Sequence, residues 1–230
     1  TARLYTDVSH ITADTALTTD MEHVFVHLAS QSRLPRLHKM WFAPFDLHRK
    51  LVAKIDALGA AAVQGKATRL VAKMNALTDE ALIQSLIRAG RKGVKIDLIV
   101  RGACMLPAQV KGHTDNIRVR SIIGRFLEHS RVFYFRVDEK EDLYLASADW
   151  MNRNMVRRVE LAWPVTDPVQ RQRLVDECLV AYLHDGLDAW DLGPDGRYTP
   201  ARGTGKAHAH GAQAALMARY ADRGKTDSGG

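Results

Sequence analysis

Apolar residues recur along the chain with two periods, and each period predicts one type of element. Spacings of three and four residues predict helices over 13–30, after Asp46, over 78–91 and over 167–184. Asp46 and Thr78 stand directly before an apolar-periodic stretch, where a side chain that caps the helix is expected. Short apolar runs separate these helices, so the chain alternates between helix and strand.

The short apolar runs are rich in β-branched and aromatic residues, which favour strands. They cover residues 3–12, 40–44, 67–75, 94–100, 117–123, 132–137, 143–146 and 159–165. The run at 94–100 is almost continuously apolar, as expected of a parallel strand that is buried on both faces. The order of helices and strands therefore predicts an α/β fold with a mixed sheet and flanking helices.

Charge narrows the kind of partner that the chain can have. Its 230 residues carry a formal net charge of +7 at pH 7. An excess of this size favours an anionic partner, which can be a nucleic acid, a membrane surface, or a phosphorylated molecule or polymer. Charge alone does not choose between them.

Two features bear on the cellular compartment. A membrane-spanning helix needs about 18 consecutive apolar residues, and no run reaches that length. No secretory signal is recognisable, and the two cysteines, Cys104 and Cys178, form no C-x-x-C motif. We therefore expect a cytoplasmic protein without a membrane span and without a thiolate zinc site.

The most informative motif is His129-Ser130-Arg131, which opens the apolar run at 132–137. Residues i and i+2 of a strand point to the same face, so His129 and Arg131 can address one ligand. An imidazole can attack or donate a proton, and a guanidinium grips phosphate oxygens. A surface histidine at the start of a strand is the alternative, and the motif alone does not exclude it.

Further polar and cationic residues follow predicted strands, where ligands of α/β sheets bind. Arg101 comes just after the run at 94–100 and can bind an anion through two N–H groups, although a salt bridge at the sheet edge is also open. The other candidates for lining a phosphate-dense channel are Lys73, Asn75, Arg118, Arg120 and Arg131. There is no P-loop and no kinase glycine-rich loop, so nucleotide binding would rely on arginines.

Taken together, six segments resemble the C-terminal portion of bacterial polyphosphate kinases of the first family. They are Thr1–Asp7, Lys73–Asn75, Gly93–Gly102, Asn116–Ile122, Arg125–Arg131 and Ser147–Met151. The resemblance implies a phospholipase-D-like mixed sheet with flanking helices, as a C-terminal fragment of a larger enzyme. Residues 1–38 would end the first phospholipase-D-like catalytic domain, 39–195 would form the second, and 196–230 would be a basic, flexible tail.

The resemblance also assigns site residues. The family's nucleotide- and phosphate-binding tyrosine falls on Tyr5, its binding arginine on Arg101 and its second active-site histidine on His129. On the residues alone, Tyr5 could instead cap a sheet edge. The histidine that becomes phosphorylated belongs to the first half of the family's fold, so we expect it upstream of Thr1.

The activity implied by the resemblance is reversible transfer of the ATP γ-phosphoryl group to inorganic polyphosphate through a phosphohistidine. Arg101 would hold nucleotide phosphates, and His129 would stabilise or protonate the transferred group. ATP, ADP and polyphosphate are the implied partners, and Mg²⁺ would accompany ATP on ligands upstream, with no metal site in this chain. We expect a homo-oligomer for the intact enzyme.

Two other functions stay open. The chain could be a nucleic-acid-binding or nuclease-like module of the phospholipase D fold, which the basic charge supports. The presence of a single histidine motif and the lack of an aromatic-studded basic platform disfavour it. It could also be a folded fragment that is inactive by itself.

Overall fold

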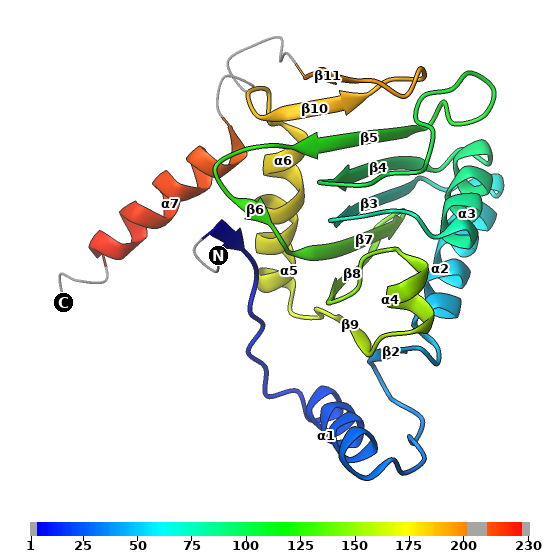
Figure 1. The fold of residues 1–230 in the computed structure, drawn as a ribbon, viewed down its shortest axis with the longest axis vertical. Helices are drawn as coiled ribbons and strands as arrows, with labels where there is room; N and C mark the ends of the chain where they lie inside the picture. Colours follow the sequence, from blue (N-terminus) through cyan, green and yellow to red (C-terminus); the bar gives the residue numbers. More distant parts are fainter. Residues whose placement is uncertain (1–3, 202–210, 227–230) are drawn as a thin grey trace.

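The computed structural model describes residues 4–201 and 211–226. Within this part of the chain, nine strands form one mixed sheet with helices on both faces (Figure 1). Across the sheet they lie in the order β11 (Tyr198–Pro200), β10 (Ala189–Leu192), β5 (Ile117–Ile122), β4 (Lys95–Val100), β3 (Thr68–Met74), β7 (Arg131–Val137), β8 (Lys140–Ala146), β9 (Glu160–Pro164) and β2 (Trp41–Ala43). The predicted α/β class, a mixed sheet with flanking helices, is confirmed.

The centre of the sheet sets the position of the strand ends. β3, β4 and β5 are parallel, with β4 in the middle, as its apolar sequence predicts. β7 is antiparallel to β3, and β8 is antiparallel to β7. The carboxyl ends of β3, β4, β5 and β8 and the beginning of β7 therefore meet at one end of the sheet, where α/β proteins bind ligands.

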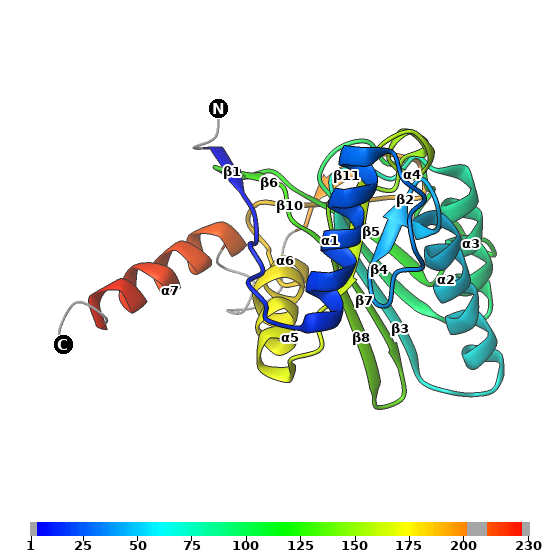
Figure 2. The same cartoon turned by 90° about the horizontal axis from the view of Figure 1, so that it is seen from below.

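Helices form a layer on each face (Figure 2). One face packs against α2 (Leu47–Val63) and α3 (Glu80–Arg91), and the other against α5 (Pro168–Leu174), the π-helical η2 (Val175–Val180) and α6 (Ala181–Leu183). Side chains alternate along β3: Leu70 and Ala72 join the first core, and Val71 joins the second. Lys73 continues the alternation and therefore faces η2 and α6.

Two helix caps differ from the prediction. α3 is capped by Asp79, whose carboxylate accepts the Leu82 N–H at 3.0 Å, rather than by Thr78. The Thr78 N–H donates to the Trp150 carbonyl at 2.8 Å, which keeps the chain out of the helix at that residue. The Asp46 carboxylate makes no cap at α2 because it accepts the Phe42 N–H at 2.8 Å.

The N-terminal part lies beside the sheet. α1 (Thr15–Ser30) begins close to the predicted residue, with Asp14 as its cap. The predicted strand over 3–12 reduces to β1 (Tyr5–Thr6), because its parallel partner β6 (Leu127–Glu128) is equally short. β6 directly precedes the His129 motif, so the β1–β6 pair joins the two segments.

The C-terminal part adds a strand and a helix. Within the range expected as a flexible tail, 196–230, the structure has β11, which pairs with β10, and the helix α7 (Ala212–Thr226). The flexibility of this range stays a prediction. The remainder of that predicted tail, residues 202–210 and 227–230, lies outside the described residues. The division of the chain at residues 38 and 195 stays a prediction. No helix in the described ranges is long and apolar enough to cross a membrane.

Candidate active site at the carboxyl ends of the central strands

Four of the predicted site residues come together at one end of the sheet. Asn75 follows β3, Arg101 follows β4, and Arg131 opens β7 two residues after His129. Met74 lies opposite Val100, and Lys73 lies opposite Val132, so these strands end in matching register. The fold therefore brings together residues that lie up to 56 positions apart in the sequence, from 75 to 131.

Arg131 is held by a two-pronged contact with Asp149. Its Nε atom donates to Asp149 Oδ1 and its Nη2 atom to Asp149 Oδ2, both at 3.1 Å. Each of the two side chains is only 11% exposed. Asp149 Oδ1 also accepts the Asn75 N–H at 2.7 Å. One carboxylate thus fixes the start of β7 against the end of β3 and orients the guanidinium.

The side chain of Asn75 binds Arg101. The Arg101 Nε atom donates to Asn75 Oδ1 at 3.0 Å. The Nη atoms of Arg101 have no partner among the described residues, and the buried Nδ2 atom of Asn75 has none either. Buried donors are rarely left without an acceptor in native proteins. A phosphate oxygen would satisfy both groups.

His129 lies at the other end of this hydrogen-bonded chain. Its Nδ1 atom is 2.8 Å from Asp7 Oδ2, and its backbone N–H donates to the Thr6 carbonyl at 2.8 Å. The Tyr5 ring meets the imidazole edge-on, with centroids 5.4 Å apart. Arg131 Nη1 donates to the His129 carbonyl at 2.9 Å. Since a carboxylate only accepts, Nδ1 donates to Asp7, and Nε2 is then the acceptor for Arg131 Nη1, which lies 3.3 Å away.

We call these five residues the strand-end network. They are Arg101, Asn75, Asp149, Arg131 and His129. The network runs along one end of the sheet and presents guanidinium, amide and imidazole nitrogens together. Such a set suits an anion with several oxygens.

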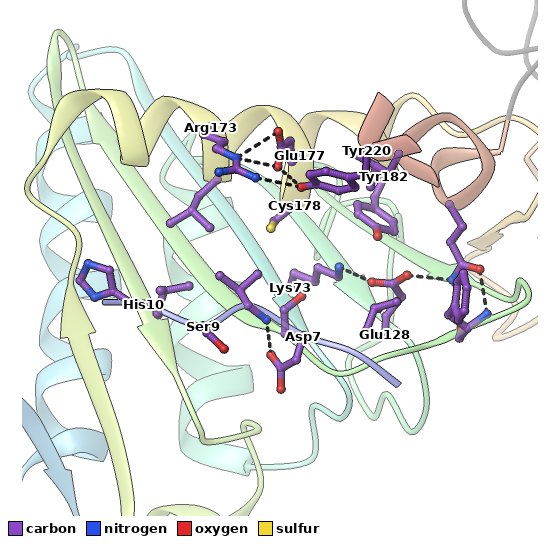
Figure 3. Close-up of a pocket in the computed structure, with 18 of the residues that line it drawn as sticks. Asp7, Ser9, His10, Lys73, Glu128, Arg173, Glu177, Cys178, Tyr182 and Tyr220 are labelled. Carbon is purple, nitrogen blue, oxygen red and sulfur yellow. Dashed lines mark hydrogen bonds and ion pairs between the residues drawn. The ribbon is translucent and has the colours of Figure 1, made fainter. Parts of the chain in front are cut away.

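Lys73 takes no part in the strand-end network. Its ammonium binds Glu128 Oε2 at 2.8 Å and lies 3.7 Å from the centroid of the Tyr182 ring (Figure 3). Both charged side chains are buried, at 3% and 5% exposure. Burial acts to raise the pKa of the Glu128 carboxyl, but the Lys73 ammonium and nearby hydrogen bonds outweigh it, so the pKa lies below its usual range.

A cavity of about 770 Å³ opens above this ion pair, between residues 6–11, η2 and α7 (Figure 3). Its carboxylates outnumber its ammonium and guanidinium groups. The former are Asp7, Glu128 and Glu177, and the latter are Lys73 and Arg173. A cavity lined by more carboxylates than cationic groups does not favour binding of a polyanion. The structure therefore does not support the prediction that Lys73 lines the polyphosphate channel.

Arg118 and Arg120 are also engaged by the protein. Arg120 binds both oxygens of Asp191, at 2.8 and 3.0 Å, and donates to three carbonyls at the end of α6 and just beyond it. Arg118 donates to Asp97 at 2.8 Å and is 68% exposed. Neither arginine joins the strand-end network.

The sequence analysis missed two carboxylates that organise the site. Asp7 binds His129, and Asp149 binds Arg131. Both lie in segments that resemble the family, and both follow a strand by one to three residues. The predicted site residues were mainly cations that bind phosphate. The carboxylates could have been sought with the rule that a buried arginine requires a carboxylate partner.

The expected Mg²⁺ finds no protein ligands here. Among residues 4–201 and 211–226, no group of three or more histidine, cysteine, aspartate or glutamate side chains could hold a metal ion. The nearest carboxylates, Asp7 and Asp149, are occupied by His129 and Arg131. The Mg²⁺ expected with ATP, on ligands upstream, stays a prediction, and the roles proposed for these residues do not involve a metal.

Comparison with known proteins gives a consistent result. Residues 40–213 match the family domain described as polyphosphate kinase C-terminal domain 2. Polyphosphate kinases from Paraburkholderia phytofirmans and Burkholderia cenocepacia are 48% and 46% identical over 220 residues, which is 96% of this chain and 32% of each relative. The chain thus spans about a third of the length of these relatives.

A solved structure agrees with the sequence relatives. The crystal structure of polyphosphate kinase from Porphyromonas gingivalis matches with a TM-score of 0.87 and 32% identity, over 94% of this chain and 33% of that one. A phospholipase D family member, Nuc from Salmonella typhimurium, has a TM-score of 0.42 at 13% identity.

Proposed function

The chain belongs to the polyphosphate kinase family, and we propose that it supplies part of the active site of an ATP:polyphosphate phosphotransferase. The enzyme would transfer the γ-phosphoryl group of ATP reversibly to inorganic polyphosphate. The observation that carries the proposal is the strand-end network, in which Arg101 and Asn75 keep N–H groups that have no partner among the described residues. Phosphoryl transfer asks a protein mainly for positioning and charge neutralisation, and these groups offer both.

Arg101 would bind the nucleotide phosphates. Its Nε atom is fixed by Asn75, so the guanidinium plane is oriented before a ligand arrives. Pre-oriented donors lose less conformational freedom on binding than mobile ones do. Asn75 Nδ2 would donate to the same phosphate or to its neighbour, and Arg131, oriented by Asp149, would add a positive charge close to them.

His129 would act as a general acid–base group. Asp7 holds Nδ1, and Nε2 lies 3.3 Å from Arg131 Nη1, so a phosphoryl oxygen that reaches Nε2 would replace this contact. In the proposed mechanism, a second histidine outside these residues forms the phosphohistidine. His129 would protonate or stabilise the phosphoryl group from the opposite side, and Tyr5, which contacts the imidazole edge-on, would contact the nucleotide.

The proposed polyphosphate channel has fewer lining residues than the sequence predicts. Asn75 and Arg131 are kept as channel residues because they belong to the strand-end network. Lys73 and Arg120 are assigned to stabilise the fold, because their charged groups bind carboxylates away from the strand-end network. Arg118, which is 68% exposed and binds Asp97 outside the network, is not kept as a channel residue.

The proposal is tested with a full-length polyphosphate kinase that contains this chain. Transfer of phosphate from ATP to polyphosphate is measured with and without competing double-stranded and single-stranded nucleic acid. We expect transfer to proceed and to resist the competitor at ionic strengths that weaken non-specific nucleic-acid binding. Strong nucleic-acid binding together with no use of polyphosphate would favour the nuclease-like alternative and overturn the proposal.

A further inference from the structure

The first turn of α7 lies against β6, the short strand that leads into His129 (Figure 1). Gln213 makes this contact with both ends of its side-chain amide. Its Oε1 atom accepts the Phe126 N–H at 2.9 Å, and its Nε2 atom donates to the Phe126 carbonyl at 2.9 Å. Nε2 also donates to Glu128 Oε1 at 2.8 Å. The amide thus pairs with the backbone of Phe126 as a neighbouring strand would.

β6 lies outside the nine-stranded sheet, so it depends on lateral contacts. β1 pairs with it through Tyr5 opposite Leu127 and Thr6 opposite Glu128. This pairing continues into the hydrogen bond from the His129 N–H to the Thr6 carbonyl. Gln213 supplies further hydrogen bonds to the same short stretch, from a helix that is distant in sequence.

The start of α7 is itself fixed. The Ala212 N–H donates to Asp185 Oδ2 at 2.6 Å, and the Asp185 side chain is fully buried. Gly124 leaves the space that the amide occupies, since a Cβ atom there would lie 2.5 Å from Gln213 Oε1. Gln213 is only 5% exposed. The contact between α7 and β6 is therefore tightly packed and fully hydrogen-bonded.

We propose that Gln213 is a positioning residue that holds β6, and through it His129, in the geometry needed for phosphoryl transfer. This inference rests on the proposed function of His129. Loss of the amide would leave the backbone groups of Phe126 without partners and would remove one donor from Glu128. β6 would then shift toward water, and the imidazole would move with it.

The test compares two Gln213 variants in a full-length polyphosphate kinase that contains this chain. Gln213→Met keeps the length of the side chain but removes its donor and acceptor. We expect kcat to fall about tenfold with KM for ATP within about twofold, since displacing a catalytic group by about 1 Å can cost about 100-fold. Ala214→Gln, at an exposed neighbouring position, is the matched control and should leave kcat unchanged.

A pH profile separates positioning from a general loss of structure. Gln213→Glu places a carboxylate beside Glu128 and should lower kcat more than Gln213→Met at neutral pH. When the introduced carboxyl is protonated, it can again donate to Glu128, so kcat relative to the unmodified enzyme should rise as pH falls. The relative kcat of Gln213→Met should not rise in this way.

Amide hydrogen exchange provides a readout that needs no substrate. In Gln213→Met, the His129 amide should exchange faster while the amides of β3 keep their rates. Unmodified kcat in Gln213→Met, or faster exchange throughout β3, would overturn the inference. An enzyme that does not use polyphosphate would instead refute the proposed function, and the exchange result would still report on Gln213.

Discussion

Two groups of basic residues in this molecule look alike in sequence and differ in structure. At the end of the sheet, Arg101 is held by Asn75 through one nitrogen and keeps its Nη atoms without a partner among the described residues. Beneath η2 and α6, Lys73 binds Glu128, and Arg120 binds Asp191 and backbone carbonyls. Positive charge alone therefore does not mark a binding residue, and Arg101 differs from Arg120 in that its Nη donors are not already bound by described residues.

The largest expected effect concerns His129, at the open end of the strand-end network. In a full-length polyphosphate kinase that contains this chain, His129→Ala should lower kcat for ATP-to-polyphosphate transfer about 100-fold or more, the usual scale of general acid–base catalysis. The thermal midpoint should change little, because the side chain is 41% exposed. Turnover at the unmodified rate would remove His129 from the mechanism.

The second effect concerns stability in the saturated region. Lys73→Met would leave the Glu128 carboxylate buried without its cation, which should lower the free energy of unfolding by about 3–5 kcal/mol at neutral pH. Urea denaturation of the chain measures this loss. A loss of unfolding free energy below about 1 kcal/mol, which is the range of exposed ion pairs, would mean that the Lys73–Glu128 pair behaves like a surface ion pair.

The same pair predicts a pH dependence. The pKa of Glu128 is lower in the folded than in the unfolded chain, so its contribution to stability is present above the ordinary carboxyl pKa and is lost as pH falls through the folded value. In Lys73→Met, burial alone would raise the folded pKa. The difference in unfolding free energy between the two proteins should therefore shrink toward acidic pH. A constant difference would contradict the assigned coupling.

A smaller effect separates Arg120 from Arg101. Arg120→Ala removes donors from Asp191 and from carbonyls at the end of α6, and it should lower the free energy of unfolding by about 2–3 kcal/mol. KM for ATP should remain unchanged in the fraction that is folded. An increase in KM for ATP without loss of stability would place Arg120 in the binding site and would contradict its assigned difference from Arg101.

The smallest effect is expected at Arg118. Its side chain is 68% exposed and binds Asp97, which also binds Arg69. Arg118→Gln should therefore change the free energy of unfolding by less than about 0.5 kcal/mol and leave kcat as it is. A clear rise in KM for polyphosphate would restore Arg118 to the predicted channel.

Much of the fold could be predicted from the sequence because long elements carry a period. The predicted bounds of α1, α3 and the helical stretch from Pro168 to Leu183 agree with the structure within a few residues. For α2 the sequence predicts only the start after Asp46, and the helix ends at Val63. The short strands β6, β10 and β11 were not predicted, because two to four residues show no clear period and because these strands depend on partners elsewhere in the chain.

The site was only partly predictable for a similar reason. Arg101 could be found because it follows a predicted strand, His129 because its motif opens one, and Tyr5 because of the family resemblance. The alternation of Arg118 and Arg120 along β5 suggested a cationic face, but the sequence does not show that Asp97 and Asp191 stand opposite them. Likewise, nothing local links Gln213 to Phe126, 87 residues earlier.

The most direct test of the strand-end network is the ATP dependence of transfer in Arg101→Ala, with Arg118→Gln as the matched arginine control. Both variants are made in a full-length polyphosphate kinase that contains this chain, and unfolding free energies are measured alongside. We predict that kcat/KM for ATP falls about 100-fold to 1,000-fold in Arg101→Ala, the scale of a lost donor to a transition-state oxygen, with stability unchanged. Equal kcat/KM values in Arg101→Ala, Arg118→Gln and the unmodified enzyme would contradict the account.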